Sequence, residues 1–291
     1  LILIFSYCSL ISQNTKIMCY NILNFPGNTP GRADTLKKII DHTTPDIFVV
    51  NELINQQGAN LILNNSLNTN GSSEYVSANF VNGHDSDNLL FYKSNKLTLV
   101  YQEQISTNLR DISYYRLYLN NSLNNDTAWF NIFSCHLKAS YGASEELLRY
   151  EEAQILKNYL DNNNINSDLY VMGDFNFYSN FEDAYYEITT GGNTALFDPI
   201  NQEGLWHINY NFRHIHTQST RGATTGLGGG ASGGFDDRFD FIFVSQDVLD
   251  GSNNIKYIED SYRAFGQDGE HYNSSINDGP NTAVSQEISS A

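Results

Sequence analysis

The stretch LYVMGDFNFY, residues 169–178, decides how this sequence is interpreted. Four apolar residues, Leu169 to Met172, run directly into Gly173, Asp174 and Asn176. An apolar run of this length, bounded by such residues, predicts a buried strand that ends at the rim of a sheet. Gly, Asp and Asn are also ordinary turn residues. This strand end alone therefore indicates either a turn or a carboxylate and an amide presented for chemistry.

Three other apolar runs end in a similar way, at Asn21, at Glu52, and at Cys135 and His136. A single case would be turn chemistry, but four predict a shared rim where strand ends converge, which is where sheet proteins place ligands. Hard cations prefer carboxylate oxygens, and phosphate accepts hydrogen bonds from His and Asn. Both kinds of side chain at one rim indicate metal-assisted hydrolysis of a phosphate ester.

Composition sets broad limits on the protein class. The 291 residues fit one large or two small domains, and aromatic residues make up 13% of the chain, which is typical of a protein rich in strands. The formal net charge is -17, and no basic stripe is present. The electrostatic pattern of a dedicated nucleic-acid-binding module is therefore missing, which argues against tight non-specific binding of nucleic acid. It does not exclude an enzyme that binds phosphate through a metal ion.

Apolar spacing predicts helices over residues 33–43 and 144–160, and in the second helix Leu148, Ile155 and Tyr159 are expected to share one apolar face. Strands outnumber helices and follow one another along the chain. This excludes a purely alternating doubly wound fold and favours two sheets packed face to face with helices outside. The expected strands lie within residues 17–20, 47–50, 75–80, 88–94, 97–104, 114–120, 129–139, 168–176 and 236–245.

Five segments in this order closely resemble the endonuclease/exonuclease/phosphatase superfamily, the group of deoxyribonuclease I and exonuclease III relatives. They are YNILNF (20–25), PDIFVVNE (45–52), SCHLKA (134–139), GDFN (173–176) and DRFDFIFVS (237–245). Residues 216–242 are also similar to secreted bacterial members. The resemblance covers residues 15–291 and implies a four-layered α/β sandwich, with two mostly antiparallel central sheets and helices outside. It further implies a divalent-metal-dependent hydrolase of phosphate ester bonds, using Mg²⁺ or Mn²⁺, with Ca²⁺ as an alternative.

The resemblance assigns roles to individual positions of this sequence. Glu52 matches the metal-binding glutamate, and Asn21 matches an asparagine that supports the metal site, often through water. Asp174 matches the aspartate that orients or deprotonates the attacking water. Asn176 matches the amide that positions this water and stabilises charge on the phosphate. His136 matches the histidine that contacts the phosphate in deoxyribonuclease-like members.

Asp240 matches the aspartate that orients a second, catalytic histidine in the family. Because Asp240 alternates with apolar residues of a strand, a structural hydrogen-bonding role stays open as well. The family's final block, Ser-Asp-His followed by an apolar strand, has no match here. We therefore expect residues 14–291 to be the catalytic domain truncated before its last strand. If the protein instead ends at Ala291, Asp240 has no histidine to orient, and a catalytically inactive binding domain becomes the alternative.

The function expected from the sequence is that of a nuclease acting on DNA or another phosphodiester. The alternative is a phosphodiesterase or phosphatase acting on a small or lipid headgroup substrate. Residues 1–13 are expected to be the remnant of a signal peptide, because residues 1–12 are apolar and too short to span a bilayer. A buried first strand is the other interpretation. We accordingly expect a secreted or periplasmic monomer without a stable membrane anchor.

Other side chains give weaker signals. Arg110 and Arg116 are equally suited to binding substrate phosphate and to forming surface salt bridges. Cys19 and Cys135 lie in apolar runs, which indicates buried free thiols, with one disulfide as the alternative. Three histidines lack the partners of a zinc site and are expected to be structural or at the surface: His207, His214 and His216.

Overall fold

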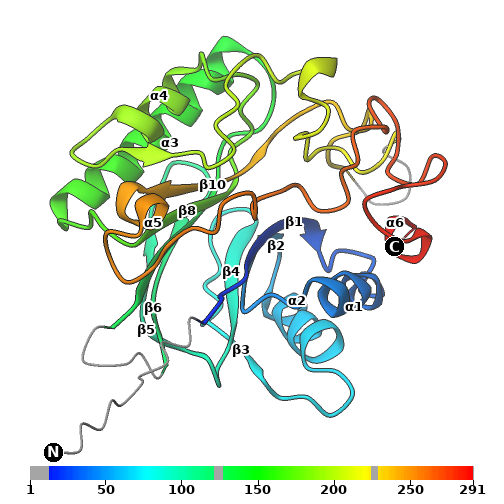
Figure 1. The fold of residues 1–291 in the computed structure, drawn as a ribbon, viewed down its shortest axis with the longest axis horizontal. Helices are drawn as coiled ribbons and strands as arrows, with labels where there is room; N and C mark the ends of the chain where they lie inside the picture. Colours follow the sequence, from blue (N-terminus) through cyan, green and yellow to red (C-terminus); the bar gives the residue numbers. More distant parts are fainter. Residues whose placement is uncertain (1–12, 121–126, 224–228, 291) are drawn as a thin grey trace, which may run out of the picture.

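The computed structural model describes residues 13–120, 127–223 and 229–290. It contains two sheets packed face to face, with helices on the outer side of each (Figure 1). The segment expected to be a signal-peptide remnant lies outside the described residues, except for Gln13. Among the helices that are described, none has the length and apolar character needed to cross a membrane.

The smaller sheet has four strands in the order β1-β2-β4-β3. The first two strands are parallel, so the chain must cross over between them, and helix α1 (Arg32–Thr43) makes this connection. The other pairs are antiparallel. Helix α2 (Gln56–Leu61) and the π-helical turn η1 (Ile62–Leu67) follow the second strand. The strands are β1 (Ile17–Phe25), β2 (Ile47–Leu53), β3 (Tyr75–Ser77) and β4 (Asp87–Lys93).

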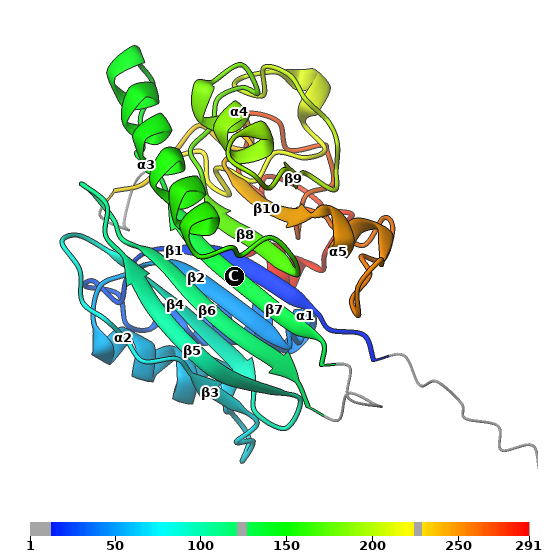
Figure 2. The same cartoon turned by 90° about the vertical axis from the view of Figure 1, so that its left-hand side faces the viewer.

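The larger sheet has six strands in the order β5-β6-β7-β8-β10-β9. Only β7 and β8 are parallel, and the long helix α3 (Ala143–Asn162) connects them. Helix α4 (Asp183–Thr190) lies beside α3 on the outer face (Figure 2). The strands are β5 (Leu97–Ile105), β6 (Ile112–Leu119), β7 (Trp129–His136), β8 (Leu169–Asp174), β9 (Leu196–Phe197) and β10 (Asp240–Ser245). The short helices are η2 (Tyr210–Phe212), α5 (Gln246–Asp250) and α6 (Gln286–Ser289).

Two apolar clusters hold these layers together. The first joins the sheets to each other and includes Val49 and Leu90 of the smaller sheet with Ile132 of the larger one. The second lies under the outer helices, where Leu156 of α3 meets strand residues such as Val171. Alternating side chains of one strand thus face two different cores. The arrangement is a four-layered α/β sandwich with mostly antiparallel sheets, and the predicted fold is confirmed.

The predicted helix over residues 144–160 is present, but its buried face is not the one expected. Leu148, Ile155 and Tyr159 are only half-buried. The buried stripe lies one position further round the helix and consists of Arg149, Glu152, Ala153, Leu156, Lys157 and Leu160. Three of these residues are charged and belong to a type that sequence patterns assign to solvent. The charged members are buried because the ends of β7 and α4 supply partners for them. The segments that form α2, η1 and α4 were not predicted as helices.

Candidate active site

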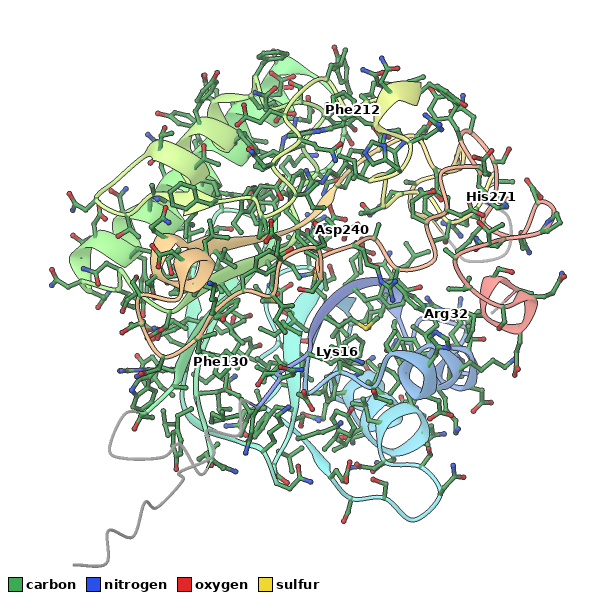
Figure 3. All side chains as sticks on the ribbon, in the orientation of Figure 1. Lys16, Arg32, Phe130, Phe212, Asp240 and His271 are labelled. Atoms are coloured by element: carbon green, nitrogen blue, oxygen red, sulfur yellow. The ribbon has the colours of Figure 1, made fainter. Side chains whose placement is uncertain are left out.

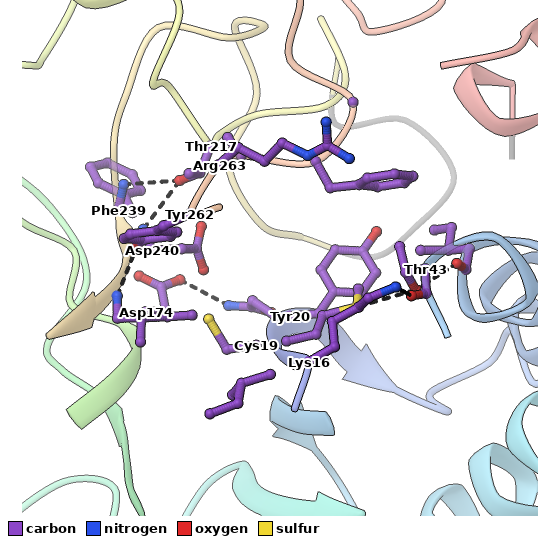
Figure 4. A pocket seen from close by; sticks show the side chains of 18 of the residues that line it. Lys16, Cys19, Tyr20, Thr43, Asp174, Thr217, Phe239, Asp240, Tyr262 and Arg263 are labelled. Atoms are coloured by element: carbon purple, nitrogen blue, oxygen red, sulfur yellow. Dashed lines mark hydrogen bonds between the residues drawn. The ribbon is translucent and has the colours of Figure 1, made fainter. Parts of the chain in front are cut away.

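The polar strand ends that the sequence singled out lie together in the structure. In the register of the larger sheet, His136 pairs with Asp174 across β7 and β8, and Asp174 pairs with Asp240 across β8 and β10. Asn21 and Glu52 reach the same place from the smaller sheet. These five side chains line one cavity of about 2320 Å³ between the sheet ends. Figure 4 shows the carboxylates of Asp174 and Asp240 pointing into the same part of it.

Asn21 joins the carboxylates of the two sheets. Its Nδ2 donates to Oε1 of Glu52 at 2.8 Å and to Oδ2 of Asp174 at 2.9 Å. Its Oδ1 is turned the other way and accepts the backbone N–H of Leu23 at 2.9 Å. The side chain therefore has both ends occupied, and its amide nitrogen faces the acidic groups. This places Asn21 as a support for the carboxylates.

Glu52 is aimed into the cavity by an unusual backbone conformation. Its φ is 62°, in the left-handed region of backbone conformation that residues other than Gly, Asn and Asp rarely adopt. Such a conformation costs ~1 kcal/mol and is retained where the surroundings require it, commonly at functional sites. Oε2 of Glu52 accepts the backbone N–H of Asn24 at 3.0 Å, which fixes the turned carboxylate.

Glu52, His136 and Asp174 could hold a metal ion together. Each offers one ligand atom, and these atoms lie within 4.8 Å of one another. Nε2 of His136 is 3.8 Å from Oε1 of Glu52. Within the described part of the chain, no Lys or Arg forms an ion pair with Glu52, Asp174 or Asp240. A set of carboxylate oxygens with one imidazole suits Mg²⁺ or Mn²⁺, and a cation would balance charge that the protein leaves uncompensated.

Burial shapes the protonation of this cluster. Burial, and next the neighbouring Asp240 carboxylate, raise the pKa of Asp174 well above its usual range. Burial also raises the pKa of Asp240, although a hydrogen bond with the Thr217 side chain opposes this. Burial, together with the positive charge of Arg110, lowers the pKa of His136 well below its usual value, so its imidazole is neutral at pH 7.

Asn176 lies two residues after the end of β8. Its φ is 53°, a conformation that Asn tolerates well, and its backbone N–H donates to Oδ1 of Asp174 at 3.1 Å. Its Nδ2 donates to the backbone carbonyl of Leu137 at 3.2 Å. The sequence left open whether Asp174 and Asn176 form a turn or present groups for chemistry; in the structure they line the cavity. Asn176 fixes one oxygen of Asp174 while lining the cavity itself.

Several contributors to the site were missed by the sequence analysis. Gln218 donates from Nε2 to Oδ2 of Asp174 at 3.1 Å, and Oγ1 of Thr217 accepts the backbone N–H of Asp240 at 3.1 Å. Both lie in a loop where no pattern marks them. Arg32, at the start of α1, lies on the other side of the cavity from Asp240 (Figure 3) and donates to the carbonyl of Leu23 at 2.8 Å.

A buried amide network below the site was also missed. Asn51, fully buried beside Glu52, donates to Oδ1 of Asn88 at 2.6 Å and to Oγ of Ser134 at 3.1 Å. These bonds cross from the smaller sheet to the larger one directly under the catalytic rim. The one sequence signal for this network was Asn51 itself, a second polar residue beside Glu52 at the end of β2. A polar residue at a strand end is equally consistent with a turn and with hydrogen bonds between two sheets.

The weaker sequence signals divide between the site and the surface. Arg110 lines the cavity and forms an ion pair with Asp85 at 3.1 Å, whereas Arg116 lies over the ring of Trp129, 4.2 Å from its centroid. Cys19 and Cys135 are free thiols. The three histidines do not converge on a metal and bond instead to separate protein groups: His207 to Asp237, His214 to Gln202, and His216 to the carbonyls of Trp206 and Phe235.

Comparison with known proteins agrees with this architecture. The pattern of the Endonuclease/Exonuclease/phosphatase family matches residues 18–253. Among solved structures, D. rerio TDP2 complexed with a single-strand DNA product is similar with a TM-score of 0.55 at 15% identity, over 79% of this chain and 82% of that one. A mannosyl-6-phosphatase from Bacteroides thetaiotaomicron is similar with a TM-score of 0.54 at 16% identity, over 80% of this chain and 86% of that one. An endonuclease/exonuclease/phosphatase family protein from Bacteroides thetaiotaomicron has a TM-score of 0.54 at 15% identity, over 80% of this chain and 83% of that one. The search of curated proteins found no match. At these identities the likeness shows the fold.

Proposed function

The chain belongs to the endonuclease/exonuclease/phosphatase family, and we propose that it is a divalent-cation-dependent phosphodiesterase, most specifically a nuclease. The observation that carries this proposal is the gathering of Glu52, His136 and Asp174 within 4.8 Å, with Asn21 joined to both carboxylates. A phosphodiester needs a cation to offset its charge and a base or orienting group for water, and this cluster offers positions for both.

The residues present fit a divalent cation. Glu52 is the most exposed of the three candidate ligands, with 15% of its side chain accessible, so it can meet an incoming ion. Asp174 is buried and Asp240 is half-buried, and neither carboxyl group is paired with a basic side chain in the described part of the chain. When bound here, Mg²⁺ or Mn²⁺ would supply charge neutralisation at the scissile phosphate. Glu52 would hold it, with Asn21 keeping the Glu52 carboxylate in place.

The remaining side chains have separate tasks in the proposed reaction. Asp174 orients the attacking water, and the Asn176 backbone N–H and the Asn21 and Gln218 amides hold its carboxylate in one direction. Of the three candidate ligands, we assign the cation to Glu52, and we assign the neutral imidazole of His136 to a phosphate oxygen, to which it donates a hydrogen bond. Asp240 lies next to Asp174 and adds a second carboxyl group at the same rim of the cavity. Fixed donors and acceptors of this kind lower the barrier because they need not reorganise during the reaction.

Nucleic acid is our leading substrate, and a small phosphate ester is the alternative. The DNA product bound to D. rerio TDP2 supports the first, and the mannosyl-6-phosphatase of Bacteroides thetaiotaomicron, equally similar in fold, supports the second. The net charge of -17 disfavours broad contact with a DNA backbone but acts weakly on a phosphate inside a cavity, since salt screens distant charges within about 10 Å. We also propose that the protein is a monomer exported from the cytoplasm, as the apolar residues 1–12 suggest.

The test is hydrolysis by the purified full-length protein of plasmid DNA, a single-stranded oligonucleotide and mannose 6-phosphate, each with Mg²⁺, Mn²⁺, Ca²⁺ or EDTA. We expect cleavage of DNA with Mg²⁺ or Mn²⁺, none with EDTA, and a fall of at least about a hundredfold in kcat for Asp174→Ala. Asp183→Ala, an exposed carboxylate on α4, is the matched control and should leave activity unchanged. Equal activity of wild type and Asp174→Ala would contradict the proposal. Cation binding without any hydrolysis would instead favour an inactive binding domain.

A further inference from the structure

Three aromatic rings form a compact cluster beside the candidate site. The ring of Tyr178 stands edge-on to that of Tyr141, with centroids 5.1 Å apart, and edge-on to that of His207, 4.9 Å apart. Tyr141 and His207 are stacked on each other, with centroids 5.8 Å apart and planes inclined by 22°. Tyr141 is 70% exposed, whereas Tyr178 is 9% exposed. The ring of Tyr141 is thus exposed to solvent and packs against the rings of Tyr178 and His207.

The cluster stands on the rim of the cavity that holds the catalytic candidates. Tyr178 follows Asn176 by two residues and lines that cavity. Ser140, the residue before Tyr141, lines it too, at the end of the loop that leaves β7 after His136. The two loops that carry Tyr141 and Tyr178 are therefore the same loops that leave the catalytic strand ends. A group attached to a phosphate in the cavity would emerge next to these rings.

A buried ion pair fixes the backbone beneath both tyrosines. The fully buried Arg149 of α3 donates to the carbonyls of Lys138 and Ser140 at 2.9 and 3.0 Å, and to Oε2 of Glu182 at 2.7 Å. Oε1 of Glu182 accepts the backbone N–H of Tyr178 at 2.7 Å. One guanidinium and one carboxylate therefore hold the two loops in a fixed relation. A ring mounted in this way loses little conformational entropy on binding a partner.

The third ring is fixed independently. Nδ1 of His207 is 2.6 Å from Oδ1 of Asp237, and the backbone N–H of His207 donates to the carbonyl of Tyr178 at 3.2 Å. The imidazole therefore has a defined plane against which Tyr141 stacks. The exposed Tyr141 gains little packing from this arrangement, because most of its surface stays in water. A rigid, exposed aromatic face beside a phosphate site is what a planar group of the substrate would need.

We propose that Tyr141, supported by His207 and Tyr178, is the stacking subsite for an unpaired base of a single-stranded nucleic acid. This inference rests on the proposed nuclease function and specifies its substrate. Bases stack on aromatic side chains irrespective of sequence, because every base presents a flat π-face. With a net charge of -17, stacking is the source of affinity that this protein can supply most readily. A base in a duplex is already stacked and paired, so it gains less.

The test uses the full-length protein with Mn²⁺ and compares a single-stranded oligonucleotide of normal bases with a series of variants, each of which has one abasic residue at a different position. Wild type should show a KM about tenfold higher when the abasic residue occupies the stacked position. Tyr141→Ala should raise the KM of the normal oligonucleotide about tenfold, leave kcat within about twofold, and lose the discrimination against the abasic one. Tyr141→Trp, which keeps an aromatic ring at this position, should retain the KM of wild type and its discrimination against the abasic oligonucleotide. Tyr186→Ala, an exposed tyrosine on α4, is the control and should behave as wild type.

A second measurement does not depend on turnover. An oligonucleotide with 2-aminopurine at the stacked position should lose fluorescence on binding to wild type and keep it with Tyr141→Ala. The base assignment is overturned if Tyr141→Ala cleaves both oligonucleotides as wild type does. A rise in KM confined to mannose 6-phosphate would assign the rings to a sugar and also overturn it. Absence of cleavage of any oligonucleotide, with wild type and all variants alike, would overturn the nuclease function itself and the subsite with it.

Discussion

Asp174 and Asp240 are direct cross-strand neighbours, paired in the antiparallel register of β8 and β10, and both side chains line the same cavity, Asp174 buried and Asp240 half-buried. Two like charges at such a pair oppose each other, and burial adds to the cost. The sheet therefore concentrates negative charge where folding alone would not favour it. The pair of carboxyl groups lowers the stability of the cation-free protein, and a bound cation would offset this cost.

Asp240→Asn should separate the effect of this carboxyl group on stability from its effect on cation binding. Burial makes the ionised Asp240 carboxylate costly, so an uncharged amide in its place should make the metal-free protein more stable by about 1 kcal/mol at pH 7. The same change should weaken cation binding, so that Mn²⁺ raises the Tm less than it does for wild type. Thermal unfolding in EDTA and in a Mn²⁺ series measures both effects. Asp183→Asn on the surface of α4 is the control, and an unchanged Mn²⁺ response in Asp240→Asn would contradict the prediction.

Asn21→Asp should make folding dependent on a cation. The substitution keeps the shape of the side chain but replaces the donor that bonds Glu52 and Asp174 at 2.8 and 2.9 Å by a third carboxylate. In EDTA the protein should lose about 1–2 kcal/mol of unfolding free energy, and a divalent cation should restore part of it. Denaturant unfolding with and without Mg²⁺ measures this. Asn60→Asp, exposed on α2, should show no such cation dependence. A loss that Mg²⁺ and Mn²⁺ leave uncorrected would indicate that the amide serves packing alone.

Gly173→Ala should be severely destabilising, by about 3 kcal/mol or more. A Cβ on Gly173 would lie 2.0 Å from the backbone carbonyl of Cys135, and the φ of 135° is itself poor for a side chain. The parallel strands β7 and β8 thus approach each other closely at the site, and only glycine permits it. Gly279→Ala is a matched control, since its φ of 98° is also positive but nothing lies within 4 Å. Similar losses of Tm in the two variants would assign the effect to backbone conformation and not to close approach.

The sequence predicted the strand ends better than the contacts between them. Glu52, His136 and Asp174 could be located because each follows an apolar run, and the family resemblance related them to one another. Gln218 could not be located, because its contact with Asp174 spans 44 positions and its own loop has no periodic pattern. The buried face of α3 was misplaced for a similar reason. Arg149 is buried because Glu182 and two loop carbonyls receive its guanidinium, and these partners, 33, 11 and 9 positions away, lie outside the helix whose periodicity was used.

Glu152→Gln should change how stability depends on pH. Burial raises the pKa of Glu152 from 4.5 to about 7, although Oε2 accepts the backbone N–H of Lys138 at 2.8 Å. Between pH 4.5 and 7 the folded state therefore binds more protons at Glu152 than the unfolded state does, so this group makes wild type less stable as the pH rises through that window. Gln keeps the acceptor for Lys138 without the charge. Relative to wild type, the unfolding free energy of Glu152→Gln should improve by about 1–3 kcal/mol between pH 4.5 and pH 8, as measured by denaturant unfolding at each pH. The neighbouring Glu151→Gln, on a half-buried residue of the same helix, should show a much smaller change. A difference from wild type that is constant across this range would mean that Glu152 does not carry a proton in the folded protein near neutral pH.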